Sequence, residues 1–341
     1  MLLLYSLHEN LSITQFNVQG AFLHAPLSKE VFIKTPKGVN RPTPYLKLKK
    51  SLYGFKQSPK NWYKTLTGWL NLIGFEESNC NPCLFVCNNK VSFVFFHIND
   101  LILVSPGNNF KVEFKNRFSN SLCHNPNTIL GMKFERCRNK IMLSLPKHIQ
   151  HGLEELGLTN CKTSVTPMTP NLKLVNASDD DHARFKKLNI NYQSAIGLLN
   201  HIAQLARPDI SFAVSNLAQH SVKPGMTHWH EVKKVWQYLK GTINFKLTLQ
   251  IKNPDQLLQI YSDASWGDDP QDRTSQSVTY SSTEAKLSPL VDSFHEGIWL
   301  KALLAEIWSI QMDAANHLID DAELNERLMM EEEEFKIKFS N

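Results

Sequence analysis

The amino-acid sequence predicts an α+β fold in which helices pack on one face of an antiparallel sheet. Residues 11–18, LSITQFNV, are strand-like. Two apolar runs within 91–105 flank the polar pair Asn99 and Asp100, which is typical of a tight hairpin. Between these strands, apolar residues recur at helical spacing from Trp62 to Ile73. The three segments together indicate strands and an amphipathic helix around one core.

Local signals define the other elements of the first half. The strand 11–18 runs into the short segment 20–23. Ser58 and Pro59 predict the N-cap and first position of the helix, and Gly74 predicts its end. Residues 139–145 read as a further strand.

The second half begins with a proline-rich and acidic stretch, 159–182, which predicts a linker. Asp209 is expected to cap a helix over 210–217, although a direct catalytic role for the Arg207, Pro208 and Asp209 triplet is an alternative. A second helix carries an apolar stripe that ends at Gly241. We interpret His228 and His230 within it as an ordinary surface pair.

The last elements are a strand, a helix and a tail. The strand 256–262 ends at Asp263, and a helix that begins at Ser281 or Ser282 carries Glu284. Pro289 is expected to end or kink this helix early. Residues 313–341 contain an acidic, helix-prone run and predict a tail.

Charge is unevenly distributed along the 341 residues, whose net charge is +5. Residues 1–150 carry 19 Lys and Arg against 7 Asp and Glu, whereas residues 313–341 carry 3 against 9. A basic half favours a polyanionic partner such as nucleic acid. A solvated basic face is the alternative.

Cysteine content and hydropathy bear on the compartment. The 6 cysteines are sparse, as expected of free thiols in a reducing compartment. No apolar run approaches the ~20 residues that cross a bilayer, and residues 1–5 are too short for a signal sequence. We therefore expect an intracellular protein without a membrane partner, in the cytoplasm or the nucleus.

Several motifs follow one another in a fixed order. They are FNVQGAFLH from residue 16, KLKKSLYGFKQSP from 47, HIND from 97, ILGM from 129, ARPDI from 206, YLKGT from 238, YSDASW from 261 and SSTEA from 281. Together they resemble the reverse transcriptase and ribonuclease H region of Ty1/copia-type retrotransposon polyproteins, over residues 10–308. The resemblance implies a palm-like antiparallel sheet with helices, followed by a truncated ribonuclease H-like α/β piece.

The resemblance also implies a polymerase centre. Such enzymes hold two Mg²⁺ ions on three carboxylates, and the matching positions here are Asn17, Asn99 and Asp100. An amide supplies a neutral oxygen but no negative charge, and Mg²⁺ prefers anionic oxygens. We expect Asp100 alone to be retained, with Mg²⁺ binding and polymerisation lost. An ordinary turn pair at Asn99 and Asp100 is the alternative.

An RNA or DNA template-primer is the partner that the resemblance implies. Candidate contacts to phosphate or nucleotide are Lys49, Lys50, Lys56, Gln57 and Lys60. Aromatic residues interleave with these lysines, a mixture that suits backbone neutralisation and base stacking. Core packing is the alternative for Trp62 and Trp69.

A second metal centre is expected in the ribonuclease H-like piece. Asp263 and Glu284 match its first two carboxylates, which also hold metal ions in the family. Only residues 274–280 stand where the family has two further strands, so that hairpin is expected to be deleted.

These matches predict four regions. They are a palm-like domain without fingers at 1–158, a linker and helical connection region at 159–250, a truncated ribonuclease H-like domain at 251–312 and an acidic tail at 313–341. Two functions remain open: a catalytically inactive relative of the polymerase and ribonuclease H, or a retained nucleic-acid-binding module without catalysis.

Overall fold

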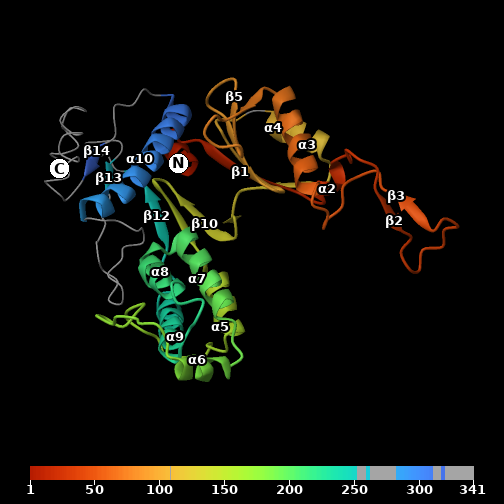
Figure 1. Ribbon diagram of the computed structural model, residues 1–341. Helices are drawn as coiled ribbons and strands as arrows, with labels where there is room; N and C mark the ends of the chain where they lie inside the picture. The colour runs from red at the N-terminus through yellow and green to blue at the C-terminus, as the bar shows by residue number, and fades with distance from the viewer. Residues whose placement is uncertain (108, 252–258, 262–281, 310–315, 319–341) are drawn as a thin grey trace, which may run out of the picture. The chain divides into compact units, whose positions relative to one another are not determined.

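The computed structural model describes residues 1–107, 109–251, 259–261, 282–309 and 316–318; for 259–261, 282–292 and 316–318 it describes only the backbone. Residues 1–251 and 252–341 form two compact units, which are treated separately below. Helices and antiparallel sheets make up the first unit, as the α+β prediction requires (Figure 1).

A six-stranded antiparallel sheet forms the centre of the first unit, in the order β4-β5-β6-β7-β1-β8. Its strands are β1 (Ser12–Val18), β4 (Phe75–Glu77), β5 (Leu84–Cys87), β6 (Phe93–His97), β7 (Asp100–Ser105) and β8 (Ser121–His124). The predicted strand at 11–18 and hairpin at 91–105 are thereby confirmed. The hairpin strands lie in the middle of the sheet, with β7 next to β1 and β6 between β5 and β7, and most of their apolar side chains are buried.

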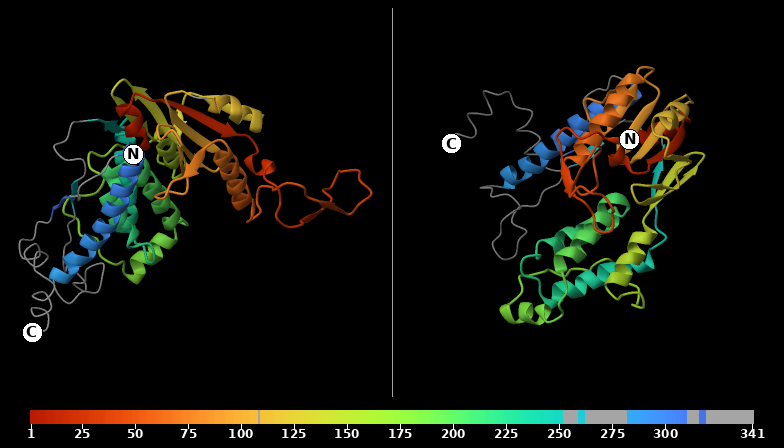
Figure 2. Two further views of the ribbon diagram at one scale, coloured as in Figure 1. Left: turned by 90° about the horizontal axis from the view of Figure 1, so that it is seen from above. Right: turned by 90° about the vertical axis from the view of Figure 1, so that its right-hand side faces the viewer.

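Helices α3 (Ser58–Leu72) and α4 (Phe110–Arg117) cover one face of this sheet (Figures 1 and 2). Trp69 of α3 packs edge-on against Phe110 and Phe114 of α4, at ring-centroid distances of 5.6 and 5.5 Å. Phe16 of β1 contacts the same two rings. Trp62 and Trp69 are both buried, so the core alternative for these residues is confirmed.

The predicted ends of α3 are nearly right. Gln57 is the N-cap, one residue before the expected Ser58, and Pro59 lies in the first turn. The Ser58 hydroxyl instead donates a hydrogen bond of 2.5 Å to the Leu52 carbonyl oxygen, which fixes the preceding loop. Gly74 follows the helix with a φ of 82°, a conformation that favours glycine.

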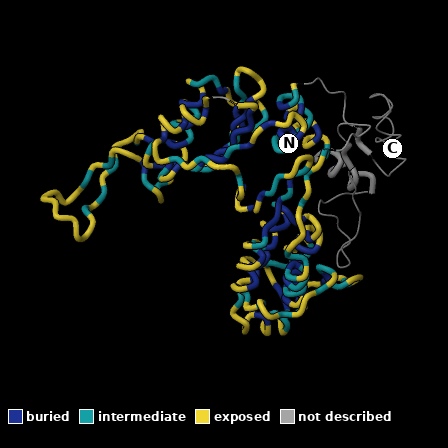
Figure 3. The backbone as a smooth tube through the Cα atoms, turned by 180° about the vertical axis from the view of Figure 1, so that it is seen from behind, coloured by how far each residue is buried: buried dark blue, intermediate teal, exposed yellow. Residues whose placement is uncertain are grey.

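A two-stranded ribbon, β2 (Phe32–Lys34) and β3 (Tyr45–Lys47), separates the short helix α2 (Ala21–His24) from α3. Figure 1 shows it as a narrow arm beyond the sheet, and Figure 3 shows that most of this arm is exposed.

A second, four-stranded sheet has the order β12-β11-β10-β9. Its members are β9 (Thr128–Ile129), β10 (Met132–Cys137), β11 (Lys140–Ser144) and β12 (Leu247–Gln250), of which β11 was predicted at 139–145. Arg136 of β10 donates hydrogen bonds to the carbonyl oxygens of Leu11 and Ser6, at 2.7 and 3.1 Å. These bonds join the second sheet to the start of β1 and to the first helix, α1 (Leu2–His8).

Helices dominate the rest of the first unit. They are α5 (Pro146–Glu155), α6 (Asp179–Lys186), α7 (Tyr192–Ala206), the 3-10 turn η1 (Pro208–Ile210), α8 (Ser211–Ala218) and α9 (Met226–Gly241). The predicted stripe of α9 is buried throughout, which confirms its amphipathic character. His228 was predicted at the surface but is 1% exposed, so that interpretation is wrong; His230 is exposed as expected.

Residues 159–178 of the predicted linker have no regular secondary structure and run along α9 in the opposite direction, whereas its last residues, 179–182, begin α6 and were wrongly assigned to the linker. Near one end, the Ser164 amide donates to the Gln237 carbonyl oxygen at 3.2 Å. Further on, Thr169 donates two hydrogen bonds of 2.8 Å to the carboxylate of Glu231. At the other end, Nε2 of His228 lies 3.0 Å from the Val175 carbonyl oxygen. Polar anchors on α9 therefore hold a segment without regular secondary structure of its own.

The second unit contains the helix α10 (Ser282–Trp308) and a parallel pair, β13 (Gln259–Tyr261) and β14 (Asn316–Leu318). The helix continues past Pro289, so the prediction that it could end at that residue is wrong. Within the described part of the chain, no helix is both long and apolar enough to cross a membrane.

Candidate active site and nucleic-acid interface

The strand register places three polar residues in one row across the sheet. Asp100 at the start of β7 is directly opposite His97 on β6 and Asn17 on β1. Directly opposite residues in an antiparallel sheet project from the same face. The adjacent pair Phe16 and Leu101 belongs to the core under α3 and α4. The row of His97, Asp100 and Asn17 therefore projects from the other face.

The hairpin tip that carries this row is firmly anchored. The turn consists of Ile98 and Asn99, and Ile98 adopts a φ of 55°. A β-branched residue in this left-handed region is strained by about 1–3 kcal/mol. The Ile98 carbonyl oxygen accepts a hydrogen bond of 2.5 Å from the Trp62 indole. The Asn99 carbonyl oxygen accepts another, of 2.9 Å, from the Val18 amide. The surrounding structure thus fixes the tip against both α3 and the end of β1.

The polar chemistry of the row does not suit magnesium. The side-chain amide of Asn17 donates a hydrogen bond of 2.6 Å to Oδ1 of Asp100, and both residues are half-buried. An amide donor directed at the carboxylate occupies an oxygen that a cation would need, and it adds no negative charge. Two Mg²⁺ ions require several anionic oxygens, and the three matched positions supply one carboxylate. Across the described residues, no group of three or more His, Cys, Asp or Glu could hold a metal ion.

His97 was not singled out from the sequence, although the hairpin brings it opposite Asp100. The available signal was the two-residue turn, because its flanking residues pair directly. His24, at the end of α2, is a second histidine that was not singled out from the sequence. Burial lowers the pKa of His24, and the charges of Lys50 and Arg117 lower it further. His24 also packs edge-on against Phe118, at a centroid distance of 5.5 Å.

All five predicted nucleic-acid contacts are exposed. They are Lys49, Lys50, Lys56, Gln57 and Lys60. Gln57, as the N-cap of α3, lies with Lys56 and Lys60 around the start of that helix, and its side chain makes no cap hydrogen bond. Lys50 lies beside α2 instead, where its Nζ donates to the His24 carbonyl oxygen at 3.3 Å. Tyr53 between them is exposed and packs on Phe22 at 4.6 Å between ring centroids. Cationic and aromatic side chains thus share the surface around the start of α3.

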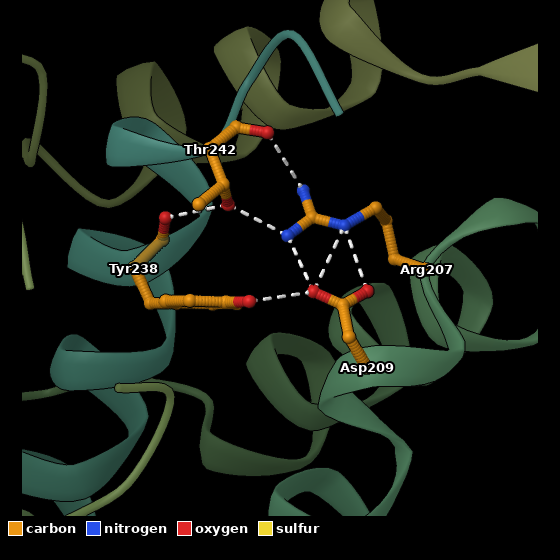
Figure 4. Close-up of polar contacts among 4 residues, drawn as sticks. All are labelled: Arg207, Asp209, Tyr238 and Thr242. Carbon is orange, nitrogen blue, oxygen red and sulfur yellow. Dashed lines mark hydrogen bonds and ion pairs between the residues drawn. The ribbon is translucent and has the colours of Figure 1, made fainter. Parts of the chain in front are cut away.

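Arg207 and Asp209 form a structural network in the helical region (Figure 4). Arg207 is 2% exposed, and its Nη2 lies 2.7 Å from Oδ2 of Asp209. The same guanidinium donates to Oγ1 and the carbonyl oxygen of Thr242, at 2.6 and 3.2 Å. Tyr238 donates its hydroxyl proton to Asp209 at 2.9 Å. The prediction that Asp209 caps α8 is therefore wrong, because Ile210 is the N-cap and no side chain caps the helix. The Asp209 carboxylate instead helps to join η1 to the end of α9.

The side chains of the two ribonuclease H candidates are not among those that the structure describes. Asp263 lies outside the described residues. Glu284 belongs to α10, where only the backbone is described at this position. Both residues, and the metal site inferred for them, remain predictions.

Comparison with known proteins gives a family match for the first half of the chain. Residues 1–170 match the family described as reverse transcriptase (RNA-dependent DNA polymerase). Through these residues, the chain belongs to the reverse transcriptase family. This family assignment covers the six-stranded sheet, the hairpin tip, the β2–β3 ribbon and the helices that pack on the sheet.

The similar proteins are transposon polyproteins. The chain is 29% identical over 332 residues to the retrovirus-related Pol polyprotein from transposon TNT 1-94 of Nicotiana tabacum, an alignment covering 87% of the chain and 25% of the relative. It is 30% identical over 326 residues to that from transposon RE1 of Arabidopsis thaliana, covering 86% and 22%. The truncated transposon Ty1-A Gag-Pol polyprotein of Saccharomyces cerevisiae is 29% identical over 287 residues, covering 78% and 24%. The chain therefore resembles Ty1/copia-type Pol polyproteins and spans about a quarter of their length.

Proposed function

We propose that this chain is a reverse transcriptase relative whose polymerase centre no longer transfers nucleotides. The hydrogen bond between Asn17 and Asp100 carries this proposal. In the family, both positions belong to the carboxylate set that holds metal. Here the amide of Asn17 binds the carboxylate of Asp100 directly, and Asn99 at the tip is neutral as well. One carboxylate is a poor basis for a two-metal reaction.

Primer extension tests this proposal. The unmodified chain, Asn17→Asp, Asn99→Asp and the double variant are compared on an RNA template with a DNA primer, in Mg²⁺ buffer. We expect no extension by the unmodified chain. Extension by the double variant alone would locate the defect in the metal ligands. Inactivity of all four would place further lesions elsewhere, whereas robust extension by the unmodified chain would contradict the proposal.

A second candidate function is nucleic-acid binding without catalysis. Its support is the sequence from 31 to 75, which contains nine Lys or Arg residues and no Asp or Glu. All nine side chains are exposed, as a phosphate-binding surface requires. The affinity for nucleic acid should then fall steeply with salt. Absence of binding in a low-salt mobility-shift assay would contradict this function.

The four predicted regions belong to the same proposal. We retain 1–158 as the polymerase-like palm, 159–250 as the connection, 251–312 as a ribonuclease H-derived piece and 313–341 as a tail. Support for the ribonuclease H ancestry is the order of the motifs around Asp263 and Glu284. Cleavage of the RNA strand in an RNA–DNA hybrid, lost in Asp263→Asn, would demonstrate activity there.

A further inference from the structure

The β2–β3 ribbon has two chemically different faces. The register pairs Phe32 with Lys47 and Lys34 with Tyr45, so these four side chains share one face. All four are exposed; Phe32 is 58% exposed and Tyr45 is 62% exposed. The other face is apolar and half-buried, and consists of Ile33 and Leu46. One face of the ribbon therefore displays two aromatic rings and two ammonium groups, with each ring opposite an ammonium group on the other strand.

Hydrogen bonds beyond the strands make the ribbon a defined element. At its base, the Leu48 amide donates to the Val31 carbonyl oxygen at 2.9 Å. Beyond the other end, the Thr35 amide donates to the Pro44 carbonyl oxygen at 2.9 Å. Phe32 and Tyr45 are diagonal neighbours, whose α carbons are typically about 7–8 Å apart. The two aromatic residues are thus neighbours on the same face of the ribbon.

The segment 31–75, which includes the ribbon, carries positive charges that are almost entirely uncompensated. Of its nine cationic residues, only Lys47 forms an ion pair among the residues that the structure describes, and its partner is Glu30. A surface of one sign attracts a polyanion, and exposed aromatic rings add sequence-tolerant stacking of unpaired bases. An acidic peptide would use the charges but would leave the rings without partners. Double-stranded nucleic acid keeps its bases stacked on each other, so it would also leave the rings unused.

We propose that this face of the β2–β3 ribbon docks single-stranded nucleic acid, with bases stacked on Phe32 and Tyr45 and phosphates neutralised by Lys34 and Lys47. The inference rests on the second candidate function above and deepens it, because it adds a stacking platform separate from the predicted contacts around α3. Lys34, Phe32 and Tyr45 were not among those contacts.

Fluorescence anisotropy with the full chain tests the inference. The probes are a labelled oligothymidylate, the matching oligouridylate, a duplex of equal length and, as competitor, inorganic polyphosphate. Removing one base–aromatic stack typically weakens binding about tenfold. We expect Phe32→Ala with Tyr45→Ala to weaken binding of both single strands by at least tenfold and binding of duplex by less than threefold. Lys34→Gln should instead lower the salt dependence by about one phosphate contact.

Matched variants separate stacking from folding and from charge. Phe212→Ala removes an aromatic ring from α8 that is 77% exposed, more than Phe32 or Tyr45, and should leave every affinity unchanged. Phe32→Trp with Tyr45→Phe keeps both rings and should retain single-strand binding. Single-strand affinity within twofold of the unmodified chain in the double alanine variant would overturn the inference while leaving nucleic-acid binding intact. Polyphosphate that displaces the single strand equally well from the unmodified chain and from the double alanine variant would also overturn the inference. If the unmodified chain bound no nucleic acid at all, the second candidate function would be lost as well.

Discussion

The α carbon of Gly152 on α5 faces the indole ring of Trp236 on α9. A β carbon built at Gly152 would lie 2.1 Å from Cη2 of that ring, far inside contact distance. Trp236 is fully buried, so its ring has no room to withdraw. Close approach of α5 and α9 therefore requires glycine at this position.

We expect Gly152→Ala to lower the free energy of unfolding by about 1–3 kcal/mol, the usual cost of overpacking a core. Gly197→Ala on α7 is the matched control, because a β carbon there meets nothing within 4 Å. That control should gain up to about 1 kcal/mol from improved helix propensity. Urea denaturation measures both changes. Equal effects of the two substitutions would contradict the packing argument.

The network around Asp209 should make stability depend on acid. Burial alone would raise the pKa of Asp209, but hydrogen bonds from Arg207 and Tyr238 and the charge of Arg207 outweigh it and lower the pKa. A lowered carboxyl pKa gives stability that is present above the unfolded value of about 4 and lost as the pH falls through the folded value. We expect this loss in urea denaturation between neutral pH and pH ~3, and less of it in Asp209→Asn.

At neutral pH, the same substitution should cost about 2–3 kcal/mol, because it leaves the buried guanidinium of Arg207 without a counter-charge. Breaking a fully buried pair typically costs ~3–5 kcal/mol, but the Asp209 side chain is 34% exposed and solvent screens it. Tyr238→Phe removes one hydrogen bond and should cost about 1 kcal/mol. A larger loss for Tyr238→Phe than for Asp209→Asn would contradict the central role of the ion pair.

Local sequence patterns were sufficient to predict several elements. The strand β1 and the β6–β7 hairpin were predicted from strand-like segments and a polar turn pair, and α3 and α9 from apolar residues at helical spacing. Asn99 and Asp100 were therefore expected near a hairpin tip. The placement of Asp100 opposite Asn17 depends on strand register, for which the family resemblance supplied the expectation and the structure supplied the contact.

Contacts between distant segments were not accessible to the same reasoning. Residues 159–182 lack a periodic apolar pattern and contain prolines, so they were predicted to be a linker. The α9 residues that anchor this segment, Glu231 and His228, lie 62 and 53 positions after their partners Thr169 and Val175. His228 was placed at the surface because a single histidine carries no pattern that distinguishes a buried, hydrogen-bonded ring from a solvated one. Asp209 looked like a helix cap from its position alone, and the network with Arg207 and Tyr238 depends on the packing of η1 against α9.

His228 should provide a second, distinct pH dependence. Its Nδ1 accepts a hydrogen bond of 2.9 Å from the Gly225 amide, so the ring is neutral and Nε2 donates to the Val175 carbonyl oxygen. The ring of His220 stacks on it at 4.1 Å. Burial lowers the pKa of His228, although the Val175 carbonyl and Asp181 raise it in part. A buried neutral histidine destabilises the fold once it must take up a proton, so stability should decline as the pH falls below about 6.5.

Urea denaturation at pH values between about 7.5 and 5 measures this decline. His228→Gln keeps an acceptor and a donor but cannot titrate, so it should flatten the profile. His182 also contacts the residues before Gly225, because it donates a hydrogen bond to the Pro224 carbonyl oxygen, and Asp179 pairs with Lys223. His182 should therefore be replaced separately. His230→Gln, at an exposed position on the same helix, is the control and should leave the profile unchanged; the opposite ranking would exclude His228 as the source.

The pair of Asn17 and Asp100 gives the most direct test of the degenerate metal centre. Asn17→Asp places a carboxylate directly opposite Asp100 and removes the amide donor of their hydrogen bond. Like charges on opposed positions of neighbouring strands repel, so the variant should lose about 1–3 kcal/mol in the presence of a chelator. A divalent cation that binds both carboxylates in the folded state alone should restore that stability as its concentration rises.

Asn17→Ala loses the same hydrogen bond without adding charge, so its stability should not respond to Mg²⁺. Thermal unfolding of the three proteins with chelator and with Mg²⁺ distinguishes the cases independently of any catalysis. A Mg²⁺ response in the unmodified chain would show that Asp100 already holds the ion with other ligands, and it would contradict the proposed loss of the site.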